Sequence, residues 1–320
     1  MNHEFEIYIL QQTGAKALGK QEIIQELWSG YGQIIRIELI DAPISSVVLK
    51  HIDLKSAHVH PRGWNTNLSH LRKVRSYEVE LEWYRNWNHF ENFKIPKCLG
   101  ISSIENHHLI LLEDLDASGF PKRMSHLSLE QAKVCVKWLA HFHGNYLQTS
   151  PKGIWQKGTY WHLDTRPDEW DVMVEGDLKN AAKELDTQLS NATYQTIVHG
   201  DAKVANFCFS SNLKEVAAVD FQYVGGGCGM KDLAYFMGSC LTEEECELYA
   251  PQILDYYFKY LKSSIAQFHP LVDAEEVEKE WRELYPVAWA DFMRFLLGWM
   301  PTHQKINSYS LKMVQQALKK

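Results

Sequence analysis

The segment from residue 198 to residue 222 constrains the chain most, because two short apolar runs in it enclose a polar turn. The runs 207–209 and 216–219 flank the turn-forming cluster 210–212, a pattern that predicts an antiparallel hairpin. Asn206 precedes the first strand and Asp220 follows the second. An antiparallel pair brings these two ends together, so we expect the two oxygen-bearing side chains to lie side by side.

These side chains suit magnesium, which prefers hard oxygen ligands and combines one or two protein groups with substrate phosphates. Asp201 lies five positions before Asn206, where a carboxylate can orient an attacking hydroxyl and accept its proton. Lys203 would place a positive charge near a γ-phosphate. The alternative is that Asp201, Asn206 and Asp220 are ordinary turn or cap residues. Their spacing around one hairpin favours a phosphoryl-transfer site.

The first part of the chain predicts a small, strand-rich unit. Residues 33–39 and the apolar run 47–49 are separated by a turn at 41–43 and read as a hairpin, entered by the bend Gly30-Tyr31-Gly32. An aromatic stripe at helical spacing predicts a helix over 77–87, and the run 109–112 predicts a buried strand. We place the lobe boundary after this strand, which gives lobes of 1–115 and 116–320.

A buried ion pair is predicted inside the first lobe. Glu80 lies within the aromatic stripe of the helix, whereas Glu78 and Glu82 fall outside it. A carboxylate on the inward face needs a partner, because burying an unpaired charge is costly. Lys50, at the end of an apolar strand, has the same requirement. One pair between Lys50 and Glu80 would satisfy both.

The second part predicts mainly helices. Ser128 and Gln131 have the spacing of a capping box at the start of one of them. One interpretation of the aromatic residues near the C-terminus is a cation-binding aromatic cage. The residues concerned are Trp281, Tyr285, Trp289, Asp291 and Trp299. An aromatic stripe at helical spacing is more often part of the core, which is the interpretation we favour.

Composition excludes several classes of protein. The formal net charge of −7 argues against a general nucleic-acid binder, which needs a basic face. No apolar stretch reaches the roughly 18 residues of a membrane span, and no secretory signal is visible. The 6 cysteines are scattered without a CxxC pair. We therefore expect reduced, structural cysteines and a cytoplasmic location. The oligomeric state is not specified by any of these features.

Together the motifs resemble a known superfamily. His199-Gly200-Asp201, followed by Asn206 and then Asp220-Phe221-Gln222, resembles the motif pair of the aminoglycoside and choline kinase superfamily of small-molecule phosphotransferases. The Asp-Phe-Gln triplet and the segment 112–115 are most similar to its ecdysteroid kinase-like (CHK-kinase-like) branch. The resemblance extends from the glycine bend to about Asp232.

The resemblance implies a two-lobed α+β fold of the protein-kinase type: a small antiparallel-sheet N-lobe and a larger, mostly helical C-lobe. ATP with Mg²⁺ would lie in the cleft between the lobes. Asp201 matches the catalytic base, and Asn206 and Asp220 match the metal ligands. Lys50 matches the lysine that holds the α- and β-phosphates, with Glu80 as its partner. The remaining nucleotide contacts would come from the hinge Glu113-Asp114-Leu115 and from the bend at Gly30 and Gly32.

Two departures from the family pattern affect these assignments. The bend at Gly30 and Gly32 is too sparse to identify a phosphate loop by itself, and Lys203 stands where many relatives carry Trp or His. Among the other polar residues near these motifs, we expect His143 and His199 to be structural and Asp232 to be a helix cap or loop anchor. His58 and His60 are expected to be solvated loop residues, and the glycine run 225–227 a flexible connection.

The predicted activity is transfer of the γ-phosphoryl group of ATP to a hydroxyl of a small molecule, such as a sterol, an amino alcohol or an aminoglycoside-like compound. A small alcohol is favoured over a protein, because the region after Asp220 is short and lacks the Ala-Pro-Glu anchor of protein kinases. The alternatives are a nucleotide-binding pseudoenzyme and a protein-modifying kinase or adenylyl transferase.

Overall fold

The computed structural model describes residues 3–27, 30–54, 67–87 and 92–319. His58 and His60 lie outside these residues. The chain divides into two compact units. The first comprises Met1–His89 and Ile95–Lys122, and the second comprises Phe90–Lys94 and Arg123–Lys320. Compared with the expected lobes of 1–115 and 116–320, the first unit runs to Lys122 and the short segment 90–94 joins the second.

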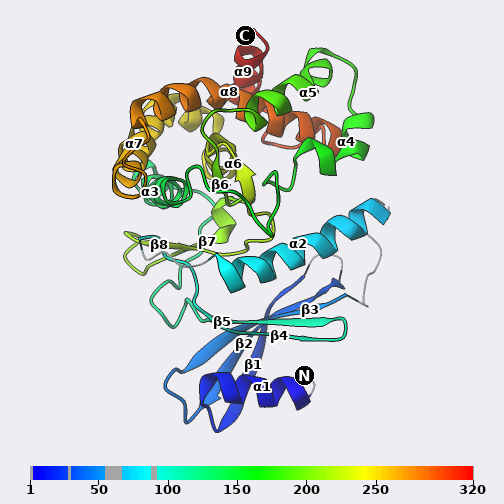
Figure 1. Ribbon diagram of the computed structural model, residues 1–320, viewed down its shortest axis with the longest axis vertical. Coiled ribbons are helices and arrows are strands. Elements are labelled where there is room, and N and C mark those ends of the chain that lie inside the picture. The colour runs from blue at the N-terminus through cyan, green and yellow to red at the C-terminus, as the bar shows by residue number, and fades with distance from the viewer. Residues whose placement is uncertain (1–2, 28–29, 55–66, 88–91, 320) are drawn as a thin grey trace. The chain divides into compact units, whose positions relative to one another are not determined.

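The first unit is built on a five-stranded sheet of order β1-β2-β3-β5-β4, in which every neighbouring pair is antiparallel (Figure 1). Two helices accompany it, and α1 lies beside β1 at the bottom of the view. The elements are α1 His3–Thr13, β1 Ala17–Glu26, β2 Gly32–Ile40, β3 Ser46–Asp53, α2 Asn67–Asn86, β4 Cys98–Ile104 and β5 His107–Glu113.

One face of this sheet carries the core of the first unit. Ile37, Leu49 and Leu111 come from β2, β3 and β5, and pack with Phe5 and Ile9 of α1. Fully burying a side chain of this size stabilises the fold by roughly 1.5–3 kcal/mol. The core therefore fixes the central strand β3, which carries Lys50, against its two neighbours.

The hairpin of β2 and β3 and the buried strand β5 confirm the predictions made from their apolar runs. Three details differ. Strand β3 continues three residues beyond Lys50, so this lysine lies inside the strand rather than at its end. Helix α2 begins at Asn67, ten residues before Tyr77, because its first turns are polar and lack the aromatic stripe. Helix α1 and strands β1 and β4 were not predicted.

The second unit is mostly helical, as expected. Ser128 caps α3 through a complete capping box with Gln131. The helices are α3 Leu129–Asn145, α4 Pro167–Asp171, α5 Asp177–Ser190, α6 Met230–Cys240, α7 Glu243–Phe268, α8 Ala274–Trp299 and α9 Ser308–Leu318, with short 3₁₀ turns at Leu163–Thr165 and Val204–Asn206. Its strands form two antiparallel pairs, β6 Thr196–Val198 with β9 Gly225–Gly227 and β7 Phe207–Phe209 with β8 Val216–Ala218.

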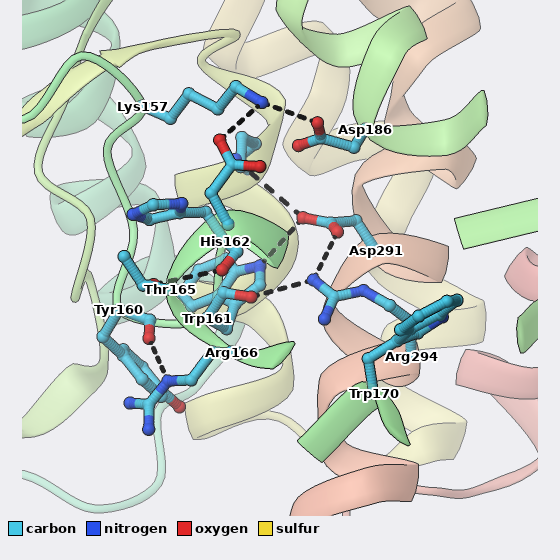
Figure 2. Close-up of polar contacts among 12 residues, drawn as sticks. Lys157, Tyr160, Trp161, His162, Thr165, Arg166, Trp170, Asp186, Asp291 and Arg294 are labelled. Carbon is cyan, nitrogen blue, oxygen red and sulfur yellow. Dashed lines mark hydrogen bonds and ion pairs between the residues drawn. The ribbon is translucent and has the colours of Figure 1, made fainter. Parts of the chain in front are cut away.

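The aromatic stripe of α8 belongs to the core. Trp281 and Trp289 are almost completely buried, and Asp291 already accepts hydrogen bonds from Trp161 Nε1 at 3.2 Å and Arg294 Nη2 at 2.7 Å. Figure 2 shows the Asp291 carboxylate enclosed by these partners. A carboxylate held in this way is not available to a cationic ligand, so the core interpretation holds and the cage interpretation does not.

The glycine run 225–227 is not the flexible connection that its composition suggested. It forms strand β9, which pairs with β6. A Cβ atom at Gly225 would lie 2.3 Å from the carbonyl oxygen of Trp155, and one at Gly226 would lie 2.6 Å from that of Gln156. These glycines are required by close backbone packing rather than by mobility.

Two findings bear on the class of protein. All six cysteines carry free thiols, and five of them are buried, as expected of structural residues. Within the described ranges, no helix combines the length and the apolar character needed to cross a membrane.

Candidate active site

The buried carboxylate of Asp232 anchors the loop that follows β6. This carboxylate accepts the backbone N–H of His199 at 2.5 Å and that of Gly200 at 2.9 Å, and it lies 3.0 Å from Nε2 of His143. Burial alone would raise the pKa of Asp232, but the hydrogen bond and charge of His143 and the backbone N–H groups hold that pKa below its ordinary value. Asp232 is therefore the anchor of the loop.

Gly200 directs the chain from this anchor into the site. Its φ of +79° lies in the left-handed region. A Cβ atom there would stand 2.0 Å from the carbonyl oxygen of Tyr223, a distance that no side chain tolerates. The glycine thus lets Asp201 follow directly after the anchored residues.

His199 connects this loop to the hairpin. Its Nε2 lies 3.0 Å from the carbonyl oxygen of Val219 and therefore carries the proton, while Nδ1 accepts the N–H of Asp201 at 3.3 Å. Complete burial lowers the pKa of His199, so the neutral ring fits both contacts. The ring fixes the spacing between Asp201 and the end of β8, which is the structural role expected of it.

The Asp201 carboxylate is the point on which the site converges. Its Oδ2 accepts Nζ of Lys203 at 2.9 Å and Nδ2 of Asn206 at 3.1 Å, and its Oδ1 accepts the hydroxyl of Tyr235 at 3.1 Å. The negative charge of Asp201 is the main cause that raises the pKa of Lys203, so this ammonium stays charged at neutral pH. Asp201 is only 5% exposed, and its orientation is fixed by three donors.

The hairpin brings Asn206 and Asp220 together as the sequence predicted. Phe207 pairs with Ala218, and the N–H of Val219 donates to the carbonyl oxygen of Asn206 at 2.9 Å, so Asp220 follows directly beside Asn206. Asp220 adopts φ +70°, a left-handed conformation that Asp tolerates better than most residues. Its Oδ1 accepts Nε2 of Gln222 at 2.6 Å.

The donor set of Asn206 and Asp220 fits a hard divalent cation. The amide nitrogen of Asn206 is committed to the carbonyl and the carboxylate of Asp201, at 2.8 and 3.1 Å, so its oxygen is the atom that faces elsewhere. Among the described residues, no group of three or more His, Cys, Asp or Glu side chains is arranged for a metal ion. An ion at Asn206 and Asp220 would thus take its other ligands from phosphates and water, as Mg²⁺ commonly does.

In the first unit, Lys50 and Glu80 form the predicted ion pair. Nζ of Lys50 lies 2.5 Å from Oε2 of Glu80, and both side chains are almost fully buried, at 4% and 2% exposure. Lys50 comes from β3 and Glu80 from α2, so the pair joins the helix to the central strand of the sheet. Such a pair holds the ammonium group in one position.

The glycine bend lies at the turn between β1 and β2. The N–H of Leu27 donates to the carbonyl oxygen of Gly32 at 2.8 Å, and the N–H of Gly30 donates to that of Leu27 at 3.1 Å. Gly32 has φ +127°, and a Cβ atom there would lie 2.0 Å from the carbonyl oxygen of His51. The geometry of this turn explains Gly32 by itself, without a phosphate ligand.

The segment 113–115 is fixed by the side chain of Asp114, which is buried. Asp114 accepts Nε of Arg36 at 2.8 Å and Oγ of Ser46 at 2.7 Å. Burial by itself raises the pKa of Asp114, but the hydrogen bonds from Ser46 and Arg36 outweigh it and lower the pKa. The side chain of Asp114 is therefore engaged in holding this segment in place.

The predicted residues thus form two groups. Asp201, Lys203, Asn206 and Asp220 come together in the second unit, whereas the glycine bend, the Lys50–Glu80 pair and segment 113–115 belong to the first. Sequence reasoning assigned no role to two further residues that contact the site. Gln222 stood inside the quoted Asp-Phe-Gln triplet, and Tyr235 falls three residues after Asp232, one helical turn along α6.

Aromatic side chains surround Asp201 in the second unit. Tyr160 is held beside the loop by its N–H, which donates to the carbonyl oxygen of Gly200 at 3.2 Å. Its ring contacts that of Tyr235, with centroids 5.6 Å apart, and that of Phe295 at 5.4 Å. In Figure 2 the Arg166 guanidinium donates to the carbonyl oxygen of Tyr160, which holds this residue from the other side. No sequence pattern indicated this arrangement.

Comparison with known proteins identifies a family. The model of the ecdysteroid kinase-like family matches residues 78–152 and 174–269, which together make up more than half of the chain. No curated protein matches the sequence.

Two solved structures share the fold over nearly the whole chain. A choline kinase from Cryptosporidium parvum Iowa II is 11% identical, with a TM-score of 0.54 and coverage of 99% of this chain and 95% of that one. A microcompartment-associated aminopropanol kinase is 14% identical, with a TM-score of 0.52 and coverage of 99% and 94%. At these identities the likeness establishes the fold, which confirms the two-lobed, protein-kinase-like α+β architecture.

The family match spans Glu80, the segment 113–115 and the three residues that donate hydrogen bonds to the Asp201 carboxylate. By this match, the chain belongs to the ecdysteroid kinase-like family.

Proposed function

We propose that this protein is a small-molecule kinase that transfers the γ-phosphoryl group of ATP to a hydroxyl group. The observation that carries the proposal is the convergence on Asp201, whose carboxylate is fixed by Lys203, Asn206 and Tyr235 beside the hairpin that ends at Asp220. Phosphoryl transfer requires mainly positioning and charge neutralisation, which these groups can supply.

In the proposed reaction, Asp201 accepts the proton of the acceptor hydroxyl. The hydroxyl oxygen forms a bond to the γ-phosphorus, the bond from that phosphorus to the β,γ-bridging oxygen breaks, and ADP leaves. The ammonium group of Lys203 lies beside the same carboxylate. Its positive charge would stabilise the negative charge on the γ-phosphoryl group during transfer. Tyr235 keeps Oδ1 of Asp201 in place while the proton moves.

Asn206 and Asp220 would hold Mg²⁺, which neutralises phosphate charge when bound. Gln222 orients the Asp220 carboxylate by a hydrogen bond, and the amide nitrogen of Asn206 donates to the carbonyl oxygen of Asp201. Both proposed ligands are therefore oriented before an ion binds. In the first unit, Lys50 would hold the α- and β-phosphates, with Glu80 fixing its ammonium group. The backbone of 113–115 would contact the adenine.

The test is an ATP-consumption screen over sterols, amino alcohols, aminoglycosides and sugars. Asp201→Asn should lower kcat by about 10²- to 10⁴-fold, the usual contribution of a general base, while nucleotide affinity is largely kept. Asp171→Asn, at an exposed carboxylate that ends α4, is the matched control and should leave turnover unchanged. Full turnover by Asp201→Asn would refute the assignment of the base.

A second variant tests the cation site. Asp220→Ala should weaken Mg²⁺-dependent ATP binding on the order of tenfold or more, measured by calorimetry with and without the metal. Equal ATP affinity in both conditions would remove Asp220 as a ligand. ATP binding without turnover on any acceptor would instead indicate a pseudoenzyme, and labelling of a polypeptide by radioactive ATP would indicate a protein-modifying enzyme.

A further inference from the structure

Lys305 lies in the connection between α8 and α9, which is held at several points. The N–H of His303 donates to the carbonyl oxygen of Met300 at 2.9 Å, and that of Lys305 donates to Nδ1 of His303 at 3.1 Å. Asn307 then caps α9 by accepting the N–H of Ser310 at 3.0 Å. The backbone of Lys305 is therefore fixed on both sides.

The side chain of Lys305 points to the aromatic residues beside Asp201. Its ammonium nitrogen lies 4.6 Å from the ring centroid of Tyr235 and 5.6 Å from that of Phe292. The hydroxyl of the same Tyr235 donates to Asp201. Lys305 and the proposed base thus contact two parts of one tyrosine, the ring and the hydroxyl.

Two cations of the described second unit that lie near Asp201 or its aromatic neighbours are already paired. Lys203 is bound to Asp201, and Arg166, which lies over the rings of Tyr160 and Phe295, is bound to Glu169 at 2.9 Å. In the part of the chain that the structure describes, no ion pair joins Lys305 to a carboxylate. A half-buried ammonium against aromatic rings thus keeps one positive charge without a matching anion.

The charge of Lys305 persists at neutral pH. Burial lowers its pKa to about 8, while the negative charge of Asp201 opposes this effect and the positive charge of Lys203 adds to it. A group with this pKa is mostly protonated at pH 7.

We infer that Lys305 is a specificity residue that binds an acidic group of the acceptor, so that the substrate is an alcohol carrying a carboxylate or sulfate rather than an amine. This inference rests on the proposed kinase function. An acidic group would supply the anion that Lys305 lacks, and the rings of Tyr235 and Phe292 would contact the apolar body. A quaternary ammonium or an aminoglycoside would instead place like charges together, which costs affinity.

A set of three matched ligands tests the inference by direct binding, without nucleotide. The compounds 4-(hydroxymethyl)benzoate, 4-(hydroxymethyl)benzamide and 4-(hydroxymethyl)benzylamine share a ring and a primary alcohol and differ in charge. Calorimetry on the full chain should show the benzoate binding at least about tenfold more tightly than the benzylamine, the size expected of one charge-assisted contact.

Three variants assign the preference to Lys305. Lys305→Met should abolish it, and Lys305→Arg should keep it. Lys259→Met is the matched control, because Lys259 also lies over a tyrosine ring, 5.6 Å from that of Tyr260, but is exposed on α7. A benzylamine that binds as tightly as the benzoate, a preference that survives Lys305→Met, or no binding of the benzoate would each overturn the inference.

The same ligands separate this inference from the proposed function. ATP consumption with the benzoate, compared between the unmodified chain and Asp201→Asn, reports on phosphoryl transfer alone. Binding of the benzoate through Lys305, with no ATP consumption on any acceptor of the screen, would support the role of Lys305 and contradict the kinase proposal. Turnover of the benzylamine in preference to the benzoate would support the kinase proposal and contradict the role of Lys305.

Discussion

Removing Glu80 should destabilise the first unit strongly, because it leaves the buried charge of Lys50 without its partner in this ion pair. The two charged atoms are 2.5 Å apart. Their attraction is roughly 7 kcal/mol at an effective dielectric constant of 20, and the cost of taking both charges out of water offsets most of it. Loss of one partner leaves that cost uncompensated, so Glu80→Ala should lower the free energy of unfolding by about 3–5 kcal/mol.

Glu78→Ala is the matched control on the same helix. Glu78 is exposed, and its pair with Arg75 at 3.2 Å should contribute only about 0.3–0.5 kcal/mol. The double variant Lys50→Met/Glu80→Leu should regain much of the lost stability, since apolar residues can replace a buried pair at little cost. It should nevertheless fail to bind ATP if Lys50 holds the phosphates.

Urea denaturation followed by circular dichroism, together with hydrogen-exchange protection of β3, measures the effect in the first unit. If Glu80→Ala costs no more than Glu78→Ala, the reasoning from burial is wrong. If the double variant binds ATP as tightly as the unmodified chain, the pair is a stability element only, and the phosphate-binding role of Lys50 fails.

Two further predictions concern the second unit. Gly200→Ala should reduce kcat strongly while leaving the stability of the first unit nearly unchanged. A Cβ atom at this position would lie 2.0 Å from the carbonyl oxygen of Tyr223, so the loop must shift and displace Asp201. Gly14→Ala is the control, because Gly14 has a similar positive φ but open space around it. Denaturation should show only the backbone strain of about 1–2 kcal/mol for this variant. Equal losses of kcat in the two variants would refute the steric argument. For an acidic acceptor, KM should rise about tenfold between pH 7 and pH 9, because Lys305 loses its proton as the pH rises through its pKa of about 8. A pH profile of KM that is identical in Lys305→Arg, which stays charged, would show that another group is responsible.

The local parts of the site were readable from the sequence. Turn residues between two apolar runs sufficed to place Asn206 and Asp220 together, because hairpin pairing depends on neighbouring residues only. The ion pair of Lys50 and Glu80 was also predictable, although these residues are 30 positions apart. This prediction rested on a general rule, namely that a charged side chain on an inward face needs a partner.

One wrong prediction and one open choice have a common physical cause. The run 225–227 was read as flexible because glycine lacks a side chain, whereas in the structure the missing side chains allow close approach of the Trp155 and Gln156 backbone. The aromatic stripe around Asp291 was open to two interpretations until Trp161, Lys231 and Arg294 were found around the carboxylate. Both outcomes depend on segments distant in sequence.

By itself, the sequence determined the hairpin, the proximity of Asn206 and Asp220 at its ends and the resemblance to a kinase family, since each depends on short spacings or on side-chain chemistry. Only the tertiary structure decided what surrounds Asp201. Tyr160, Tyr235 and Lys305 come from a loop, a helix and an interhelical connection. Their meeting results from packing among α6, α8 and the chain on either side of them, which no local pattern encodes.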